Sequence, residues 1–288
     1  MDRQTDAVAV ARAPRGTGAR GSGLALRQAQ GDREQRRTVG ARKTAVAALI
    51  AVGCLVSVPA QDLPAPPSTF SILGFDPATG EVGGAVQSRV FSVGNGVLWA
   101  EADAGIVATQ AIVDVSYGPK GLELLRRGMN PETIIRTILD GDPDPGYRGN
   151  PWPKAGRQFA VMDAKGNYAA HTGPSATPWA GHKSGKFATA QGNILAGEPV
   201  VAGMIDAFEK TTGHLSVRLM AALDAGQAAG GDTRGMQSAA MLIVRKGCGV
   251  WLNNDTVLRL QVDDAPDPLK EMRRLVEIWN ARQRRPCK

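Results

Sequence analysis

The chain has 288 residues, a net charge of +7 and a sequence pI near 9.6, but this basicity is concentrated at its beginning. Residues 1–60 hold ten of the 34 Lys and Arg and only four of the 27 Asp and Glu, so the remaining chain is close to neutral. The pI is therefore no evidence for nucleic-acid binding, and no nucleic-acid partner is expected.

Residues 1–60 resemble an Arg-rich leader followed by a signal peptide. A basic flank precedes the apolar run "TAVAALIAVGCLVSV" at 44–58, and the small residue Ala60 follows it. An apolar stretch of about 15 residues is typical of a signal peptide, whereas a membrane span needs roughly 20. We expect cleavage after Ala60, a periplasmic or secreted protein, and no stable membrane span after processing. The alternative is an uncleaved anchor.

The three cysteines have different expected roles. Cys54 lies inside the apolar run, and lipid attachment there is disfavoured because Ala51 occupies the position where lipoprotein signals usually carry Leu. Cys248 and Cys287 could pair in an oxidising compartment, although sequence cannot show that they are close enough.

After the leader, residues 61–68, "QDLPAPPS", are predicted to form a stiff, Pro-rich linker. Residues 69–282 suffice for a single domain with a substantial core, and residues 283–288 form a basic tail. Strands are predicted over 69–75 and 82–90, on either side of the turn sequence "DPATGE".

The later elements show helices in pairs between groups of strands. Such an order differs from the strict alternation of a parallel sheet. We therefore predict an α+β fold, a four-layer αββα sandwich of two antiparallel sheets flanked by helix pairs. The remaining predicted elements are strands over 96–100 and 104–113, helices over 118–128 and 130–141, a hairpin over 157–173, helices over 198–211 and 215–226, strands over 236–247 and 256–264, and a helix over 267–283.

Familiar catalytic signatures are absent from the sequence. It has no G-x-S-x-G, no H-E-x-x-H and no complete P-loop. A three-histidine zinc site would need His171, His182 and His214 together, at spacings that do not favour one. No metal and no cofactor is expected.

Thr69 begins the first predicted strand. Composition alone explains it as a β-forming residue. A Thr hydroxyl is a poor nucleophile without an adjacent base, and an N-terminal Thr carries one in its own α-amino group, with a pKa of about 8. An internal Thr has only a non-basic amide nitrogen there. The chemistry therefore depends on whether Thr69 becomes the N-terminus.

Several segments together resemble a known family over essentially all of 69–278. They include "TFSILGFDPATGEVGGAVQSRVFSVG", "GIVATQA", "SYGPKGLELL", "PWAGH", "AQGNILAG", "GGDTRGMQSAAMLIV" and "LRLQVDDAPDPLKEMRRL". The family is the bacterial and archaeal domain of unknown function 1028, assigned to the N-terminal-nucleophile (Ntn) hydrolases.

The resemblance implies an αββα sandwich, amide-bond hydrolysis, and Thr69 as the presumed nucleophile. It implies no particular substrate. Cleavage after Ala60 would leave Thr69 behind "QDLPAPPS", so activity would require a second cut between Ser68 and Thr69.

Other site residues are proposed from their chemistry. Asn193, expected just before a helix, could offer its side-chain amide and adjacent backbone N–H groups to an oxyanion, or could be a plain N-cap. Asp232 and Ser238 could orient the amine and hydroxyl. Arg234 could bind a substrate carboxylate, or Asp232 and Arg234 could form a loop salt bridge.

Further substrate contacts are expected around the nucleophile. Ser88 and Arg89, at the end of the second strand, would lie near Thr69 if the hairpin register is as predicted. His182 could line the cleft, or be an ordinary loop histidine. The candidate catalytic residues are Thr69, Asn193, Asp232 and Ser238, and the candidate substrate-binding residues are Ser88, Arg89, Arg234 and His182.

The leading hypothesis is a secreted amidohydrolase acting on a small-molecule or peptide substrate through Thr69. The alternative is a non-catalytic envelope protein of the same fold that binds a peptide or glycan fragment. A chiefly structural or assembly role is a third hypothesis. An exposed sheet edge or helix layer could support a homodimer.

Overall fold

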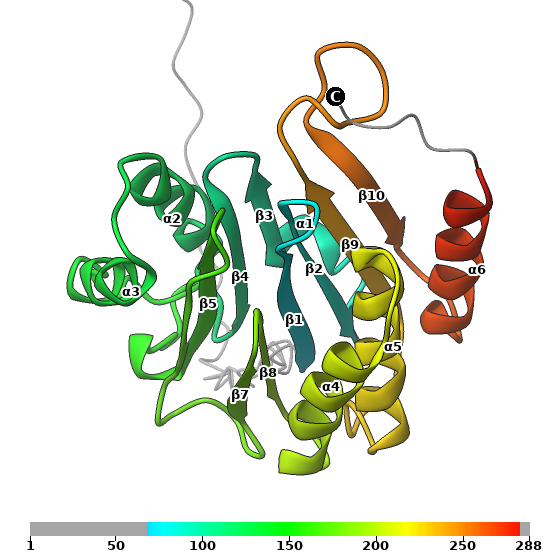
Figure 1. Ribbon diagram of the computed structural model, residues 1–288. Coiled ribbons are helices and arrows are strands. Elements are labelled where there is room, and N and C mark those ends of the chain that lie inside the picture. The colour runs from blue at the N-terminus through cyan, green and yellow to red at the C-terminus, as the bar shows by residue number, and fades with distance from the viewer. Residues whose placement is uncertain (1–67, 283–288) are drawn as a thin grey trace, which may run out of the picture. The chain divides into compact units, whose positions relative to one another are not determined.

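The computed structural model describes residues 68–282, which form two antiparallel β-sheets and six α-helices (Figure 1). The larger sheet has the strand order β10-β9-β2-β1-β8-β7, and the smaller has the order β3-β4-β5-β6. The strands are β1 (Thr69–Asp76), β2 (Glu81–Ser88), β3 (Leu98–Glu101), β4 (Gly105–Ala111), β5 (Arg157–Asp163), β6 (Tyr168–Thr172), β7 (Gly181–Gly185), β8 (Ala188–Asn193), β9 (Ser238–Val244) and β10 (Thr256–Val262).

Four of the six helices form the two predicted pairs and a fifth is the predicted final helix, whereas the single turn at Gly94–Val97 was not predicted and takes up the start of the strand expected over 96–100. Asn130 caps the second helix of the first pair, as expected, because its side chain accepts a hydrogen bond from the Thr133 amide. The helices are α1 (Gly94–Val97), α2 (Tyr117–Arg126), α3 (Pro131–Asp140), α4 (Glu198–Lys210), α5 (Leu215–Ala228) and α6 (Pro268–Ala281).

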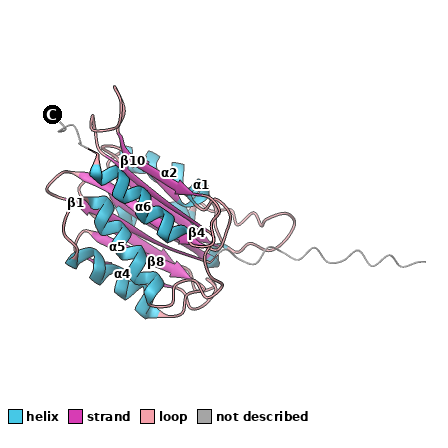
Figure 2. Ribbon diagram, turned by 90° about the vertical axis from the view of Figure 1, so that its right-hand side faces the viewer, coloured by secondary structure: helices cyan, strands magenta, loops and turns pink. Residues whose placement is uncertain are grey.

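Strand β1 lies inside the larger sheet and bonds to β2 on one edge and to β8 on the other. Its side chains alternate between two cores. Phe70 and Ile72 belong to the core shared with α4, α5 and α6, which lie in a row beside the sheet in Figure 2. Leu73 and Phe75 belong to the core that also contains residues of β4 and β5. A third core joins β4 and β5 to α2 and α3.

The hairpin of β7 and β8 was missed by the sequence prediction, which had a loop before the helix at 198. Its sequences, "GHKSG" and "ATAQGN", contain no large apolar side chain and hence no alternating pattern. Every residue of β8 is nevertheless buried, because β8 pairs with β1 and β7. Asn193 therefore ends a strand, and the cap position of α4 belongs to Gly197.

Several expectations concern residues outside the described part of the chain. The leader, the linker before Ser68, Cys54, Cys287 and the basic tail all lie there. Cys248 is disulfide-bonded, and because it is the only cysteine in 68–282, its partner also lies outside the described residues. Between residues 68 and 282, none of the helices has the length and apolar character needed to cross a bilayer.

Candidate active site

Four polar residues form a row across the larger sheet. Thr69 on β1 pairs in register with Ser88 on β2 and with Asn193 on β8, and Ser88 pairs with Ser238 on β9. Directly opposed residues of antiparallel strands present their side chains on the same face. All four are at most 1% exposed. The sheet thus brings together residues that are more than 160 positions apart in the chain.

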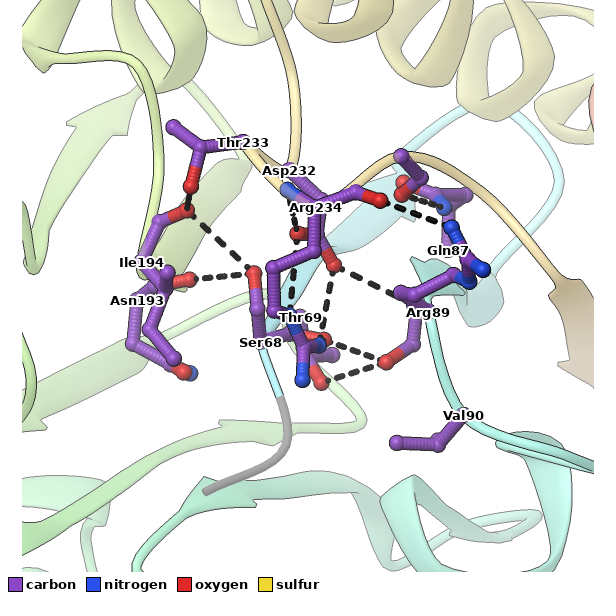
Figure 3. A network of polar contacts seen from close by, with 12 residues as sticks. Ser68, Thr69, Gln87, Arg89, Val90, Asn193, Ile194, Asp232, Thr233 and Arg234 are labelled. Atoms are coloured by element: carbon purple, nitrogen blue, oxygen red, sulfur yellow. Dashed lines mark hydrogen bonds and ion pairs between the residues drawn. The ribbon is translucent and has the colours of Figure 1, made fainter. Parts of the chain in front are cut away.

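The Thr69 hydroxyl takes part in a directed hydrogen-bond chain (Figure 3). Its Oγ1 lies 3.1 Å from Ser88 Oγ, and Ser88 Oγ donates in turn to the carbonyl oxygen of Ser68. A serine hydroxyl has a single proton to donate. Because Ser88 donates that proton to Ser68, Thr69 is the donor to Ser88.

The carbonyl of the Ser68–Thr69 peptide bond has a second donor, Arg234. Arg234 Nη2 lies 3.1 Å from Ser68 O and 3.1 Å from Asp232 Oδ2, and Arg234 Nε lies 3.3 Å from Asp232 Oδ1. Asp232 is buried and also accepts from the Arg89 amide at 3.1 Å. The salt bridge considered for this pair is present, and Asp232 orients the guanidinium that contacts Ser68 O. In the described part of the chain, Asp232 makes no hydrogen bond to Thr69, and binding of a substrate carboxylate by Arg234 stays a prediction.

Arg89 follows β2 at the exposed edge of the site. Its Nη1 donates to the Arg234 backbone oxygen at 2.8 Å. Gly235 has a φ of +104°, and a Cβ at that position would lie 3.1 Å from Arg89 Nη1. Glycine therefore serves both the backbone conformation and the close approach of the guanidinium. The placement of Ser88 and Arg89 near Thr69 agrees with the predicted register.

Asn193 is held by a buried network of glutamines. Its Nδ2 lies 3.2 Å from Gln158 Oε1, while Gln158 Nε2 donates to the carbonyl oxygens of Gly192 at 2.8 Å and Gly181 at 3.1 Å. Because these two backbone oxygens only accept hydrogen bonds, the NH2 group of Gln158 must face them and its Oε1 must face Asn193. The NH2 group of Asn193 therefore faces Gln158. The remaining end, Asn193 Oδ1, is a buried acceptor without a partner among the described residues.

The donors expected around Asn193 are thus engaged elsewhere. The amide of Ile194 donates to Thr177 O at 3.1 Å, and that of Leu195 donates to Trp179 O at 3.0 Å. The groups that bond the Ser68 carbonyl are instead Ser88 and Arg234. Asn193 is opposite Thr69 in the strand register, and the remaining polar atom of its side chain is an acceptor, not the donor that the predicted oxyanion role needs.

Ser238 and His182 do not contact Thr69. The Ser238 hydroxyl donates to Val90 O at 2.5 Å and accepts from Val93 N at 3.0 Å, and so fixes the loop after Ser88. His182 lies on β7, which β8 separates from β1.

His182 has its own surroundings at the edge of the larger sheet. Its Nδ1 is 2.9 Å from Thr172 Oγ1, and it lines a pocket of about 500 Å³ together with Pro174 and Ala180. Burial lowers the pKa of His182. Between residues 68 and 282, no three His, Cys, Asp or Glu side chains gather to hold a metal ion.

Ser68 and the glutamines beneath the row, Gln110 and Gln158, were not among the residues predicted from the sequence. Gln110 on β4 donates from Nε2 to Thr69 O at 3.2 Å and to Gln158 Oε1 at 2.9 Å. The available signal was a glutamine within a mostly apolar strand sequence, "GIVATQA", since a buried amide needs hydrogen-bond partners. Its partners could not be read from the sequence, because they lie on other strands.

The comparisons with known proteins agree with this architecture. A family model described as "Family of unknown function (DUF1028)" matches residues 69–272, the range that contains Thr69 and the Asp232–Arg234 pair. The chain belongs to the DUF1028 family. No curated protein matches it.

A solved structure of a DUF1028 protein is similar as well. The crystal structure of protein SPO2555 from Silicibacter pomeroyi, assigned to DUF1028, is 31% identical in sequence, with a TM-score of 0.65. The match covers 75% of this chain and 91% of that one. The similarity thus extends over most of the DUF1028 domain.

Proposed function

We propose that this DUF1028 protein is an exported amide-bond hydrolase of the Ntn type, with Thr69 as its nucleophile. The observation that carries the proposal is the environment of the Ser68–Thr69 peptide bond. Its carbonyl accepts from Ser88 and Arg234, and the Thr69 hydroxyl donates to the same Ser88. Helices on the outer faces of two sheets that share a core support assignment to the αββα sandwich of that superfamily.

The first reaction would be a cut within the chain itself. Thr69 Oγ1 attacks the Ser68 carbonyl carbon and gives its proton to Ser88 Oγ, which passes its own proton to the carbonyl oxygen. Arg234 stabilises the negative charge that develops on this oxygen until the proton arrives. When the carbon–nitrogen bond breaks, the Thr69 nitrogen takes up the proton from this oxygen, the C=O double bond re-forms, and an ester joins Ser68 to Thr69 Oγ1. Water hydrolyses this ester to a Ser68 carboxylate and a free Thr69 α-amine.

The free amine supplies the base that the uncut chain lacks. An α-amino group with a pKa of about 8 can accept the proton of its own hydroxyl. A substrate carbonyl would occupy the place of the Ser68 carbonyl, between Ser88 and Arg234. Attack gives an acyl ester on Thr69 and releases the amine product with the proton, and water then releases the acid. Asn193 Oδ1, a buried acceptor beside Thr69, is suited to orient the amine.

The test is the state of the N-terminus over time. The full chain is expressed with its leader, recovered from the periplasm and the medium, and followed by intact mass and N-terminal sequencing. We expect a start at position 69 for the wild type and for Thr69→Ser, and a start ahead of position 69 for Thr69→Ala. Thr212→Ala, a change at an exposed threonine, is the matched control and should be cut normally. A wild-type chain that keeps Ser68 indefinitely contradicts the proposal.

One observation favours the alternative of a non-catalytic binding protein. In the uncut chain Thr69 is only 1% exposed, so a substrate could not reach its hydroxyl in this form. A protein that works in this form would keep a stable start ahead of Thr69 and would not react with acylating probes directed at amines and hydroxyls. Labelling at Thr69 by such a probe would exclude this alternative.

A further inference from the structure

Ser68 supplies the carbonyl of the Ser68–Thr69 peptide bond. Its side chain therefore lies where the side chain of a substrate acyl group would lie. Its side chain is completely buried. Its hydroxyl donates to the backbone oxygen of Asn193 at 2.9 Å and lies 3.4 Å from that of Ile194. These two carbonyl oxygens define what we call the Ser68 subsite. Both are acceptors, so the subsite is complementary to a hydrogen-bond donor.

The backbone that builds the subsite is unusual and firmly held. Ile194 has a φ of +54°, which is rare for a β-branched residue because the side chain crowds the backbone there. Its amide donates to Thr177 O, and its carbonyl oxygen accepts from the Thr233 amide at 3.2 Å and the Thr233 hydroxyl at 3.1 Å. Such conformations persist where the surroundings impose them, and they cluster at functional sites. The Ile194 oxygen is thus fixed in place before any acyl group arrives.

We propose that the Ser68 subsite determines which acyl groups the enzyme accepts. It selects amides whose acyl part carries a short side chain with a hydroxyl or amine donor on the β-carbon, as a seryl group does. This inference rests on the proposed function, since it assumes that the acyl side chain of a substrate binds where the Ser68 side chain lies. An alanyl group has no hydroxyl, so the buried backbone oxygen of Asn193 would lose this hydrogen-bond donor. An aromatic side chain would be too large for the space that the serine side chain fills.

The first test uses the cut within the full chain. The rate at which the Thr69 terminus appears is measured by mass for the wild type, Ser68→Ala, Ser68→Thr and Ser68→Val. Thr and Val have the same shape and differ in the donor, so they separate hydrogen bonding from steric effects. We expect Ser68→Ala to be cut about fivefold more slowly than the wild type, and Ser68→Val about fivefold more slowly than Ser68→Thr. The matched control Ser184→Ala changes an exposed serine on β7 and should leave the rate unchanged.

The second test uses the same protein after the cut is complete. Hydrolysis of N-acetyl-seryl, alanyl, valyl and phenylalanyl 4-nitroanilides is followed, and kcat/KM is compared. We expect the seryl compound to exceed the alanyl compound at least about fivefold, with the phenylalanyl compound slowest.

The outcomes separate the two proposals. If the wild type acquires the Thr69 terminus but Ser68→Ala is cut as fast, and the alanyl and seryl anilides react equally, the subsite inference is wrong and the hydrolase stands. If no protein acquires the Thr69 terminus and no anilide is cleaved, the proposed function fails and this inference fails with it. A preference for the donor in either series supports the subsite.

Discussion

Arg157 and Asp142 form an ion pair inside the protein, with Arg157 Nε 3.1 Å from Asp142 Oδ2 and the two side chains 2% and 0% exposed. The Tyr117 hydroxyl donates to the same carboxylate oxygen, and Arg157 Nη1 donates to the backbone oxygens of Ile112 and Trp152. One buried guanidinium therefore joins β5 to the segments on either side of the helix pair α2 and α3. It organises a region rich in Pro and Gly that has little apolar packing of its own.

Loss of this ion pair should destabilise the fold strongly. Asp142→Asn keeps the shape but leaves the Arg157 charge buried without a counter-ion, and we expect a loss of about 3–5 kcal/mol in the free energy of unfolding. Urea denaturation measures it. The matched change at the partly exposed Arg273–Asp224 pair, Asp224→Asn, should cost less than about 1 kcal/mol. Equal losses at the two pairs would contradict the structural role given to Arg157.

The stability of the fold should fall on mild acidification because of His171. Burial, and the charge of His182 nearby, lower the pKa of His171 from its ordinary value of 6.5. The folded protein thus binds protons less readily than the unfolded chain. The stability contributed by His171 is complete above about pH 6.5 and is lost as the pH falls toward the folded pKa.

Replacement of His171 tests this pH dependence. His171→Gln should narrow the difference between urea midpoints at about pH 7.5 and about pH 5.5, because it removes a group that protonates preferentially in the unfolded chain. His182→Gln should narrow this difference less, because His182 is exposed on β7 although partial burial lowers its pKa. An unchanged difference in both variants would show that these histidines titrate alike in the folded and unfolded protein.

Ser88 should matter for the rate of the cut more than for stability. Ser88→Ala removes one donor to the Ser68 carbonyl and the acceptor of the Thr69 hydroxyl, and we expect the cut to slow by about 10²–10³-fold. The appearance of the Thr69 terminus by mass gives the rate, and urea denaturation of the same samples gives the stability. A rate within threefold of the wild type, on the order of 0.7 kcal/mol, would remove Ser88 from the mechanism.

Gln158 should be a positioning residue with an effect on stability as well. Gln158→Leu leaves the Asn193 Nδ2, Gln110 Nε2 and Gly192 O groups short of a partner, and each such buried group costs about 1–3 kcal/mol. In contrast, Gln261→Leu, whose partners lie near solvent, should change the free energy of unfolding by less than about 1 kcal/mol.

A second measurement separates the positioning role of Gln158 from a purely structural one. If the glutamine holds Asn193 with its oxygen beside Thr69, Gln158→Leu should shift the pH dependence of anilide hydrolysis, which reports the Thr69 amine. An unchanged pH profile in a folded variant would show that Gln158 stabilises the fold but does not position Asn193 for the reaction.

The sequence predicted the part of the site that depends on local turn chemistry. The residues of "DPATGE" determine where β1 ends and β2 begins, and counting back from that turn places Thr69 opposite Ser88. The Asn130 cap and the two helix pairs likewise follow from residues that are close in the chain.

What sequence analysis could not supply depends on contacts between distant strands. β8 has small and polar side chains that become buried because β1 pairs with it, and its 188–193 segment carries no periodic signal of its own. The orientation of the Asn193 amide depends on Gln158, which in turn depends on two backbone oxygens of the β7–β8 hairpin. These contacts between distant strands have no local signature, so the orientation of the Asn193 amide could not be predicted from the sequence.

The interior position of β1 has a consequence for maturation. Thr69 is paired with Ser88 on one edge and with Asn193 on the other, so we expect it to keep its position when the preceding segment is removed. Removal of the preceding segment would therefore need no refolding: the dormant and working molecules would share one shape and differ by a single covalent event. Activation of such a precursor would require cleavage of one peptide bond and no conformational change.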